Sequence, residues 1–314
     1  TAIDPYGHEL WRWTFPVNQL NQQTEQLSPL SSRPAYTETE NELTVKANKR
    51  TFIFSKKDGQ LKGVSVDNRK ISFANGPRFI GARRADRSLD QFYNHDDEKA
   101  KEKDRTYSEF PDAAVFTKLD VKEDGGNLVV TANYKLGNLD KTQWTINPSG
   151  ELALDYTYNF SGVVDLMGIR FDYPEDQVIS KRWLGAGPYR VWQNRIHGTQ
   201  YDVWENDYND PIPGETFTYP EFKGYFGDVS WMNIQTKEGT ISLTNETPDA
   251  YIGVYQPRDG RDRLLYTLPE SGISVLNVIP PVRNKVNSTD LCGPSSQPKW
   301  VNGPQTGRVI FRFM

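Results

Sequence analysis

The sequence predicts an all-β protein built from antiparallel strands. Apolar side chains alternate with polar ones at period two in several runs, and turn signals separate these runs. Helical patterns are almost absent between them, although parallel strands would need helical crossovers. At 314 residues, the chain is long enough to bury a substantial core, as one large domain or as two of ordinary size.

The alternation predicts which side chains share the buried face of each strand. In ELALDYTYNF, residues 151–160, one face is shared by Leu152, Leu154, Tyr156, Tyr158 and Phe160. Further alternating positions are Ile169, Phe171 and Tyr173, then Ile273 and Val275, and finally Val309, Phe311 and Phe313. Arg170 and Asp172 are the polar residues that alternate with the apolar members of the second run. Because the chain carries 8 Trp, 16 Tyr and 15 Phe, we expect aromatic rings to supply much of the core.

Glycine-containing turn signals lie between these runs, as expected of antiparallel meanders. They are KKDGQ (56–60), KEDGG (122–126), NPSG (147–150), TKEGT (236–240) and PRDGR (257–261). The only helix-like composition is DDEKAKEKDR (96–105), which lacks an apolar stripe and is typical of a solvated loop or short surface helix.

We expect two regions along the chain. Residues 1–40 form a lead-in: ELWRWTFPV (9–17) has the composition of a strand left from a preceding domain, and the polar residues 17–40 form a linker. A strand at 41–54 then begins the single large domain, 41–314. The opening TAIDPYGHEL, without an initiator Met or signal-peptide core, predicts a mature product or a fragment.

Bulk composition excludes several classes of partner. The formal charge of −4 gives no basic footprint for nucleic acid, and no window of eighteen apolar residues is present to span a membrane. The single cysteine, Cys292, excludes an internal disulfide and leaves the redox compartment open. We expect a periplasmic or secreted bacterial protein.

We expect neither metal nor cofactor. His8, His95, His197 and Cys292 do not have the spacing of a zinc site. The acidic turn ENDYND, with Asp207, Asn209 and Asp210, lacks the Gly and distal Glu of an EF-hand. There is no G-x-S-x-G nucleophile elbow, and GAGP (185–188) lacks the third Gly and the Lys of a phosphate loop.

Glycoside hydrolysis needs two carboxyl groups, and three glutamates stand among aromatic residues: Glu205, Glu215 and Glu221. An apolar environment raises the pKa of a carboxyl and suits it to proton donation. The alternative, which we favour, is that each glutamate is hydrogen-bonded at a strand end.

The stretch LGAGPYRVWQNRIHG, residues 184–198, combines a bend with an unusual concentration of functional groups. Gly185, Gly187 and Pro188 force the bend. Around them lie flat aromatic faces and planar hydrogen-bonding groups, the combination with which proteins hold sugars: Trp183, Tyr189, Arg190, Trp192, Gln193, Asn194, Arg195 and His197. Alternation predicts Trp192 and Asn194 on one strand face, with Trp192 an exposed platform beside a groove. The structural alternative pairs Arg195 with Glu205 or Glu221 to hold a turn.

This stretch resembles the C-terminal domain of glycoside hydrolase family 2, the β-galactosidase family, whose members carry G-x-G-P followed by an aromatic and an Arg. Gly185, Gly187, Pro188, Trp192 and Arg195 match that pattern. Three further blocks resemble the domain in the same order, so that the resemblance spans about 41–314: residues 58–86, 219–231 and 290–297. It implies a large antiparallel β supersandwich of the galactose-mutarotase type, following a small β domain.

The resemblance also implies where catalysis resides. The family's two catalytic glutamates belong to a (β/α)₈ barrel that precedes this domain, and no such pattern occurs in these 314 residues. Known β-galactosidases have an acidic residue, a Tyr and an Asp where this chain has Arg190, Trp192 and Asn194. They place a Trp of the last loop at the sugar site, where this chain has Cys292. Both departures argue against strict galactose specificity.

Three functions remain open at this point. The leading one is a non-catalytic C-terminal module that supports the upstream barrel of the same polypeptide and lends a loop to its galactoside or related glycan. A free-standing mutarotase or epimerase would have only His197 with Glu205 or Glu221 as acid and base. A carbohydrate-binding domain would use Trp183, Trp192 and Trp231 as platforms. Whichever holds, the candidate sugar-contacting residues are Trp183, Tyr189, Trp192, Arg195, His197, Glu205, Glu221, Trp231 and Cys292.

Overall fold

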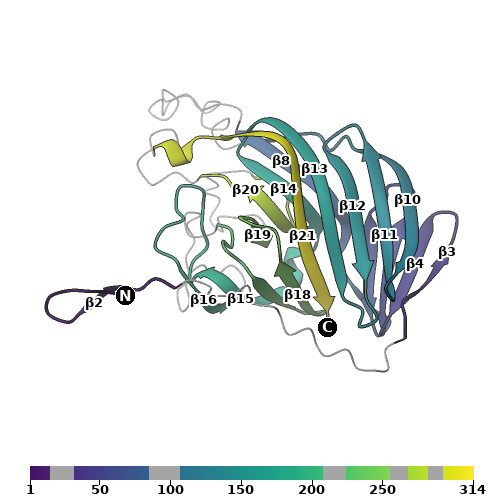
Figure 1. Ribbon diagram of the computed structural model, residues 1–314, viewed down its shortest axis with the longest axis horizontal. Coiled ribbons are helices and arrows are strands. Elements are labelled where there is room, and N and C mark those ends of the chain that lie inside the picture. The colour runs from purple at the N-terminus through teal and green to yellow at the C-terminus, as the bar shows by residue number, and fades with distance from the viewer. Residues whose placement is uncertain (15–31, 85–106, 208–223, 255–267, 282–292) are drawn as a thin grey trace.

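The computed structural model describes residues 1–14, 32–84, 107–207, 224–254, 268–281 and 293–314. Throughout these ranges the chain forms β-strands, turns and two short 3₁₀ helices, and every pairing between two named strands is antiparallel. Two large sheets face each other across one core (Figure 1). The predicted antiparallel β supersandwich is therefore confirmed.

One sheet has nine strands. In spatial order they are β10 (Val115–Asp124), β11 (Asn127–Lys135), β12 (Leu139–Ile146), β13 (Leu152–Val164), β21 (Lys299–Phe313), β18 (Gly239–Asn245), β17 (Trp231–Thr236), β15 (Val178–Gly187) and β16 (Gln200–Asp207). The long strand β21 runs through its middle, so that the C-terminal segment pairs with β13 on one side and β18 on the other.

The second sheet has ten strands. Its main path is β19 (Tyr251–Val254), β20 (Ile273–Val278), β14 (Leu166–Asp172), β8 (Ala74–Arg84), β6 (Leu61–Val66), β5 (Arg50–Ser55), β4 (Glu42–Ala47) and β3 (Ala35–Glu38). Two short strands, β7 (Arg69–Ile71) and β9 (Tyr107–Glu109), pair with β6 and β8. The 3₁₀ turns are η1 (Glu175–Gln177) and η4 (Pro294–Ser296).

The sandwich core is aromatic, as the composition predicts. Phe73 of the β7–β8 connection stacks on Phe171 of β14 with ring centroids 4.7 Å apart. The ring centroid of Phe311 of β21 lies 5.0 Å from that of Phe73. The predicted inward faces of 152–160, 169–173, 273–275 and 309–313 are all buried. Such packing is the main favourable contribution to folding.

Two sequence predictions about the N-terminal part need correction. The strand expected at 41–54 is the hairpin β4–β5, because Asn48 and Lys49 adopt positive φ and reverse the chain. Residues 35–38, expected within the linker, form the edge strand β3, whose side chains are all exposed and therefore show no alternation. The helix-like segment 96–105 lies outside the described residues. The division between 1–40 and 41–314 stays a prediction.

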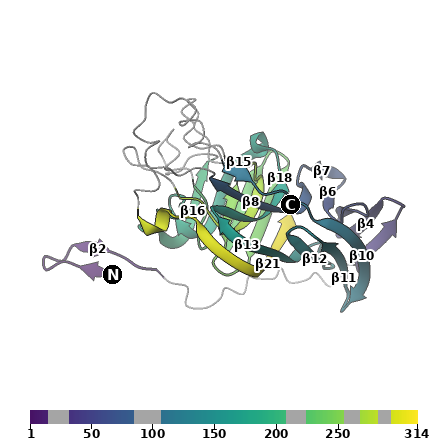
Figure 2. The same ribbon diagram turned by 90° about the horizontal axis from the view of Figure 1, so that it is seen from above.

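A separate two-stranded hairpin precedes the sandwich. Its strands are β1 (Ala2–Ile3) and β2 (Glu9–Trp11), and it projects away from both sheets in the two perpendicular views (Figures 1 and 2). Large apolar side chains on it are exposed, among them Ile3, Tyr6 and Leu10. No helix in the described part of the chain is long and apolar enough to cross a membrane.

Candidate functional site

The stretch 184–198 begins at the end of β15 with two closely packed glycines, Gly185 and Gly187. A Cβ on Gly185 would lie 2.9 Å from the carbonyl oxygen of Gly227, and one on Gly187 would lie 2.4 Å from the indole of Trp204. β15 ends at Gly187, and the Gly187–Pro188 peptide bond is cis. The bend predicted from these residues is confirmed, and close packing explains why both positions are glycine.

We expect Gly185→Ala to lower the free energy of unfolding by about 1–3 kcal/mol, since the added methyl group meets backbone atoms of residues 227–229 that cannot rotate away. Urea unfolding followed by tryptophan fluorescence measures this. Gly125→Ala is unsuitable as a control because Gly125 has positive φ, so Gly63→Ala, with nothing nearer than 3.9 Å, is used instead. Equal effects of the two variants would contradict the packing role of Gly185.

Trp192 is buried, and the expectation that it forms an exposed platform is wrong. Its side chain is 1% exposed and meets the ring of Tyr225 edge-on, with centroids 5.7 Å apart. Together with Val191 these rings join a second hydrophobic cluster that includes Ile80 of β8 and Leu276 of β20. The neighbours Phe79 and Val275 point into the main core, so this second cluster covers the opposite, outer face of the ten-stranded sheet.

Hydrogen bonds hold the loop in this position from several directions. Val191 exchanges two backbone bonds with Tyr225, at 2.7 and 2.8 Å. The side-chain amide of Gln193 donates to the carbonyl oxygen of Gln297 at 2.8 Å, and that of Asn194 donates to the Ser296 hydroxyl at 3.0 Å. The loop is thereby tied to the 3₁₀ turn η4, which precedes the last strand.

The tip of the loop points away from these anchors. A tight turn pairs Trp192 with Arg195, so residues 192–195 do not form the strand that the predicted face-sharing of Trp192 and Asn194 requires. Arg195, Ile196 and His197 are exposed. The pairing of Arg195 with Glu205 is wrong, because a carboxylate oxygen of Glu205 lies 3.9 Å from Nε of Arg182 instead. The other pairing, with Glu221, lies outside the described residues.

The other predicted residues differ in their exposure. Trp183 is fully buried, so it too is not a platform. Tyr189 is half-buried and donates to the Gly198 carbonyl at 2.7 Å, and Trp231 is half-buried at the start of β17. Glu215, Glu221 and Cys292 lie outside the described residues. Whether the exposed members bind a sugar stays a prediction.

The structure does not bring the described acid and base of the epimerase hypothesis together. In the β15–β16 ladder Gln200 faces Gly187 and Glu205 faces Arg182, so five residues of extended strand, roughly 17 Å, separate the two ends of this segment. His197 lies beyond the Gln200 end, next to Gly198, which Tyr189 holds. The ladder thus separates His197 from Glu205, and the other acid of this hypothesis, Glu221, lies outside the described residues.

A cavity of about 440 Å³ opens beside the loop. Its lining combines an indole, a phenol, hydroxyls, an amide and a carboxyl group, contributed by Trp13, Tyr201, Thr199, Ser230, Gln200 and Asp228 among others. The Tyr201 and Ser230 hydroxyls are 2.5 Å apart. Such a mixture can hydrogen-bond a polyhydroxylated ligand and stack against its C–H surface.

Asp228 is the acid of this cavity. Burial raises the pKa of its carboxyl, and the negative charge of Asp249 raises it further. Asp228 thus keeps its proton to higher pH than an ordinary aspartate and can both donate and accept hydrogen bonds. Because neither residue stands in a recognisable motif, sequence reasoning did not single them out.

A charged cluster that the sequence analysis missed occupies the outer face of the ten-stranded sheet. Arg78 and Arg170 are cross-strand partners; Arg78 pairs with Asp172, and Arg170 donates to the Glu270 carbonyl. Asn75 donates to Asp172 at 2.9 Å. Burial lowers the pKa of Arg170, as does the nearby charge of Arg78. In the sequence Arg170 and Asp172 have the pattern of ordinary solvent-facing residues of an alternating strand, so nothing singled them out.

The described residues hold no group of three His, Cys, Asp or Glu side chains placed to bind a metal ion. Asp207 ends β16, and its two predicted partners Asn209 and Asp210 lie outside the described residues.

Comparison with known families decides the relationship. The family model described as β-galactosidase small chain matches residues 46–281, about three quarters of the chain. The chain belongs to the β-galactosidase small chain family. The match contains the loop 184–198, so the resemblance drawn from that loop is confirmed at the level of a β-galactosidase-type domain.

One solved structure supports the fold of this small-chain domain, and a second is reported beside it. Galactose 1-epimerase from Lactobacillus acidophilus NCFM has a TM-score of 0.50 at 10% identity, covering 90% of this chain and 99% of its own. An aldose epimerase homologue from C. elegans has a TM-score of 0.43 at 7% identity, covering 90% and 99%. No curated protein matches the sequence. At such identities the epimerase likeness concerns the galactose-mutarotase-like fold alone.

Proposed function

We propose that this small-chain domain is the non-catalytic, carbohydrate-associated part of a family 2 glycoside hydrolase. It would lie downstream of the (β/α)₈ barrel in the same polypeptide, support that barrel, and lend the tip Arg195–Ile196–His197 to its sugar site. The catalytic carboxyl groups would belong to the barrel.

The observation that carries this proposal is the construction of the loop. Its buried side chains, such as Trp192 and Gln193, fix the backbone, while three consecutive residues at the tip stay exposed. A site that binds a transition state needs groups held in place before the substrate arrives, and rigid anchoring provides this. An exposed guanidinium and imidazole on a fixed support suit the hydroxyl groups of a glycan.

The N-terminal hairpin supports the proposed contact with neighbouring domains. A two-stranded hairpin is marginally stable alone, and this one exposes Ile3, Tyr6 and Leu10 away from the sandwich. Exposed large apolar side chains gathered on one element mark a surface that another part of the protein covers.

We expect the double variant Arg195→Ala/His197→Ala, in the polypeptide that includes the barrel, to lower kcat/KM for an aryl β-galactoside about tenfold. Arg195 and His197 make no ion pair among the described residues. The melting temperature of the double variant should therefore stay within about 2 °C of that of the parent protein. Arg182→Ala, which removes an exposed cation from β15 away from the tip, serves as control and should keep full activity.

Full activity of the double variant would refute the contribution of the tip. The isolated 314-residue chain should neither hydrolyse the aryl galactoside nor interconvert galactose anomers above the buffer rate. Hydrolysis by the isolated chain would show that it is catalytic. Anomer interconversion, followed by polarimetry, would replace the proposal with a mutarotase.

A further inference from the structure

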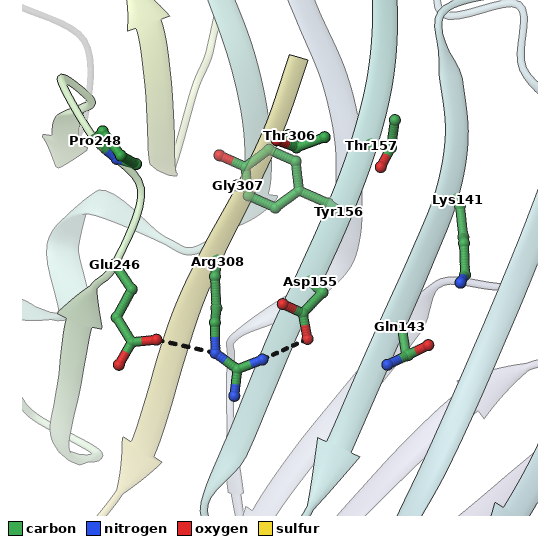
Figure 3. Close-up of a pocket in the computed structure, with 10 residues that line it drawn as sticks. All are labelled: Lys141, Gln143, Asp155, Tyr156, Thr157, Glu246, Pro248, Thr306, Gly307 and Arg308. Atoms are coloured by element: carbon green, nitrogen blue, oxygen red, sulfur yellow. Dashed lines mark hydrogen bonds and ion pairs between the residues drawn. The ribbon is translucent and has the colours of Figure 1, made fainter. Parts of the chain in front are cut away.

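A groove of about 390 Å³ lies on the outer face of the nine-stranded sheet, where β12, β13 and β21 run side by side (Figure 3). It belongs to neither the loop 184–198 nor its neighbouring cavity. Two rows of polar side chains cross the three strands in register: Gln143, Asp155 and Arg308 form one, and Lys141, Thr157 and Thr306 form the other. Adjacent strands are about 4.8 Å apart, so this array has the size of one or two sugar rings.

Arg308 is fixed at the centre of the groove. Its Nη1 lies 2.5 Å from the Asp155 carboxylate and its Nε lies 3.0 Å from that of Glu246, which follows β18 (Figure 3). Burial lowers the pKa of Arg308, but the hydrogen bonds and charges of the two acids outweigh this and raise it. The two carboxylates use only part of the guanidinium, which carries five N–H donors.

The remaining polar side chains around Arg308 have no partner within the described chain. Lys141, Gln143, Thr157 and Thr306 line the groove, and none of them hydrogen-bonds to another described residue. They offer an ammonium, an amide and two hydroxyls, so both donors and acceptors face the same space. Gly307 and the edge of the Tyr156 ring lie beside them (Figure 3).

The charges of the groove balance. Lys141 and Arg308 are positive, and Asp155 and Glu246 are negative. A balanced set attracts neither anions nor cations over a distance, yet it can donate to and accept from every hydroxyl of a neutral ligand. Trp231 lies on the same outer face: its partner Thr244 faces Ile310, two residues along β21 from Arg308.

We propose that this groove is a second carbohydrate site, which binds a neutral di- or oligosaccharide through its hydroxyl groups. The site is separate from the loop that the proposed function uses, and its binding is measured on the chain itself. Failure of one proposal therefore leaves the other standing.

The test is calorimetric titration of the chain with lactose and galactobiose, with amide chemical shifts to locate binding. We expect millimolar affinity and shifts confined to residues 141–143, 155–157 and 306–308. Gln143→Ala/Thr306→Val should raise Kd at least tenfold at unchanged melting temperature, since both side chains are on the outer face. The control Gln235→Ala/Thr240→Val changes the same residue types on the same face outside the groove and should bind like the parent.

Parent-like binding by the groove variant, or absence of shifts at these amides, would overturn the proposal. Binding of a galacturonic acid dimer in preference to lactose would also overturn it, because a charge-balanced groove gives an acidic sugar no advantage.

Discussion

Trp192→Ala is expected to lower the free energy of unfolding by about 3–5 kcal/mol. The indole is 1% exposed and fills the space between the loop and the outer face of the ten-stranded sheet, against Tyr225 and the aliphatic side chains of β8 and β20. Its removal leaves a cavity that the flanking strands cannot close, because they are also held by the main core. Urea unfolding gives the difference directly.

Trp300→Ala is the matched control. Trp300 is 71% exposed on β21, so its loss should change stability by less than about 0.5 kcal/mol. The comparison separates the two roles considered for Trp192, since an exposed sugar platform would behave like Trp300. A Trp192 variant as stable as the parent would show that the loop does not depend on this anchor.

Trp192→Ala should also release the loop tip. On either side of Trp192, Val191 hydrogen-bonds to Tyr225 and Gln193 hydrogen-bonds to Gln297. Both contacts require the loop to stay packed against the sheet. If the domain serves a catalytic barrel as proposed, we expect Trp192→Phe to keep most of the activity of that longer polypeptide, because the smaller ring still fills much of the cluster. The activity of Trp192→Ala should fall even at temperatures where the domain remains folded.

The sandwich could be predicted from sequence because one physical signal dominates it. In β13 and β21 one face is buried and the other is solvated, so apolar and polar residues alternate. The β4–β5 turn was not predicted because Asn48–Lys49 contains no glycine, although Asn tolerates positive φ. Strand β3 was not predicted because a fully exposed edge strand shows no alternation of apolar and polar residues.

The candidate site was less accessible to sequence reasoning for a different reason. Trp192 looks the same in sequence whether it stacks on a sugar or on Tyr225, and only the long-range cluster with Ile80 and Leu276 decides. A signal did exist: ISVLNVI, residues 273–279, is apolar almost throughout, which indicates a strand buried on both faces. Something therefore had to cover the outer face of that sheet.

The polar groove could not be found from the sequence at all. Gln143, Asp155 and Arg308 are common surface residues separated by up to 165 positions, and strand register alone places them in one row. A slip of one residue between β13 and β21 would turn Arg308 toward the core and leave no groove.

We expect the free energy of unfolding to begin to fall near pH 10 as the pH is raised. Tyr156 of β13 is 2% exposed, and burial raises the pKa of its phenol from 10.0 to about 12. Burial also raises the pKa of Tyr158 and of Tyr225, both of them buried. In the unfolded chain all three phenols regain an ordinary pKa near 10.

The sign of the effect follows from proton binding. Below pH 10 both states are protonated and the full stability is present. Between pH 10 and pH 12 the folded state keeps a proton on Tyr156 that the unfolded state loses, so the free energy of unfolding falls as pH rises. The rise in the pKa of Tyr156 from 10.0 to about 12 corresponds to about 3 kcal/mol, and Tyr158 and Tyr225 add losses of the same sign.

The measurement is a pH series of urea unfolding above pH 9, with tyrosinate absorbance and near-ultraviolet circular dichroism recorded on the same samples. Ionisation of the buried phenols should coincide with loss of the dichroism signal. Tyr156→Phe should reduce the slope of stability against pH by about one proton, because the phenylalanine ring keeps the packing and removes the titrating group. Tyr6→Phe, at an 86% exposed position on the N-terminal hairpin, should leave the slope unchanged. If every tyrosine titrated near pH 10 while the native dichroism persisted, burial in the sandwich would not control these phenols.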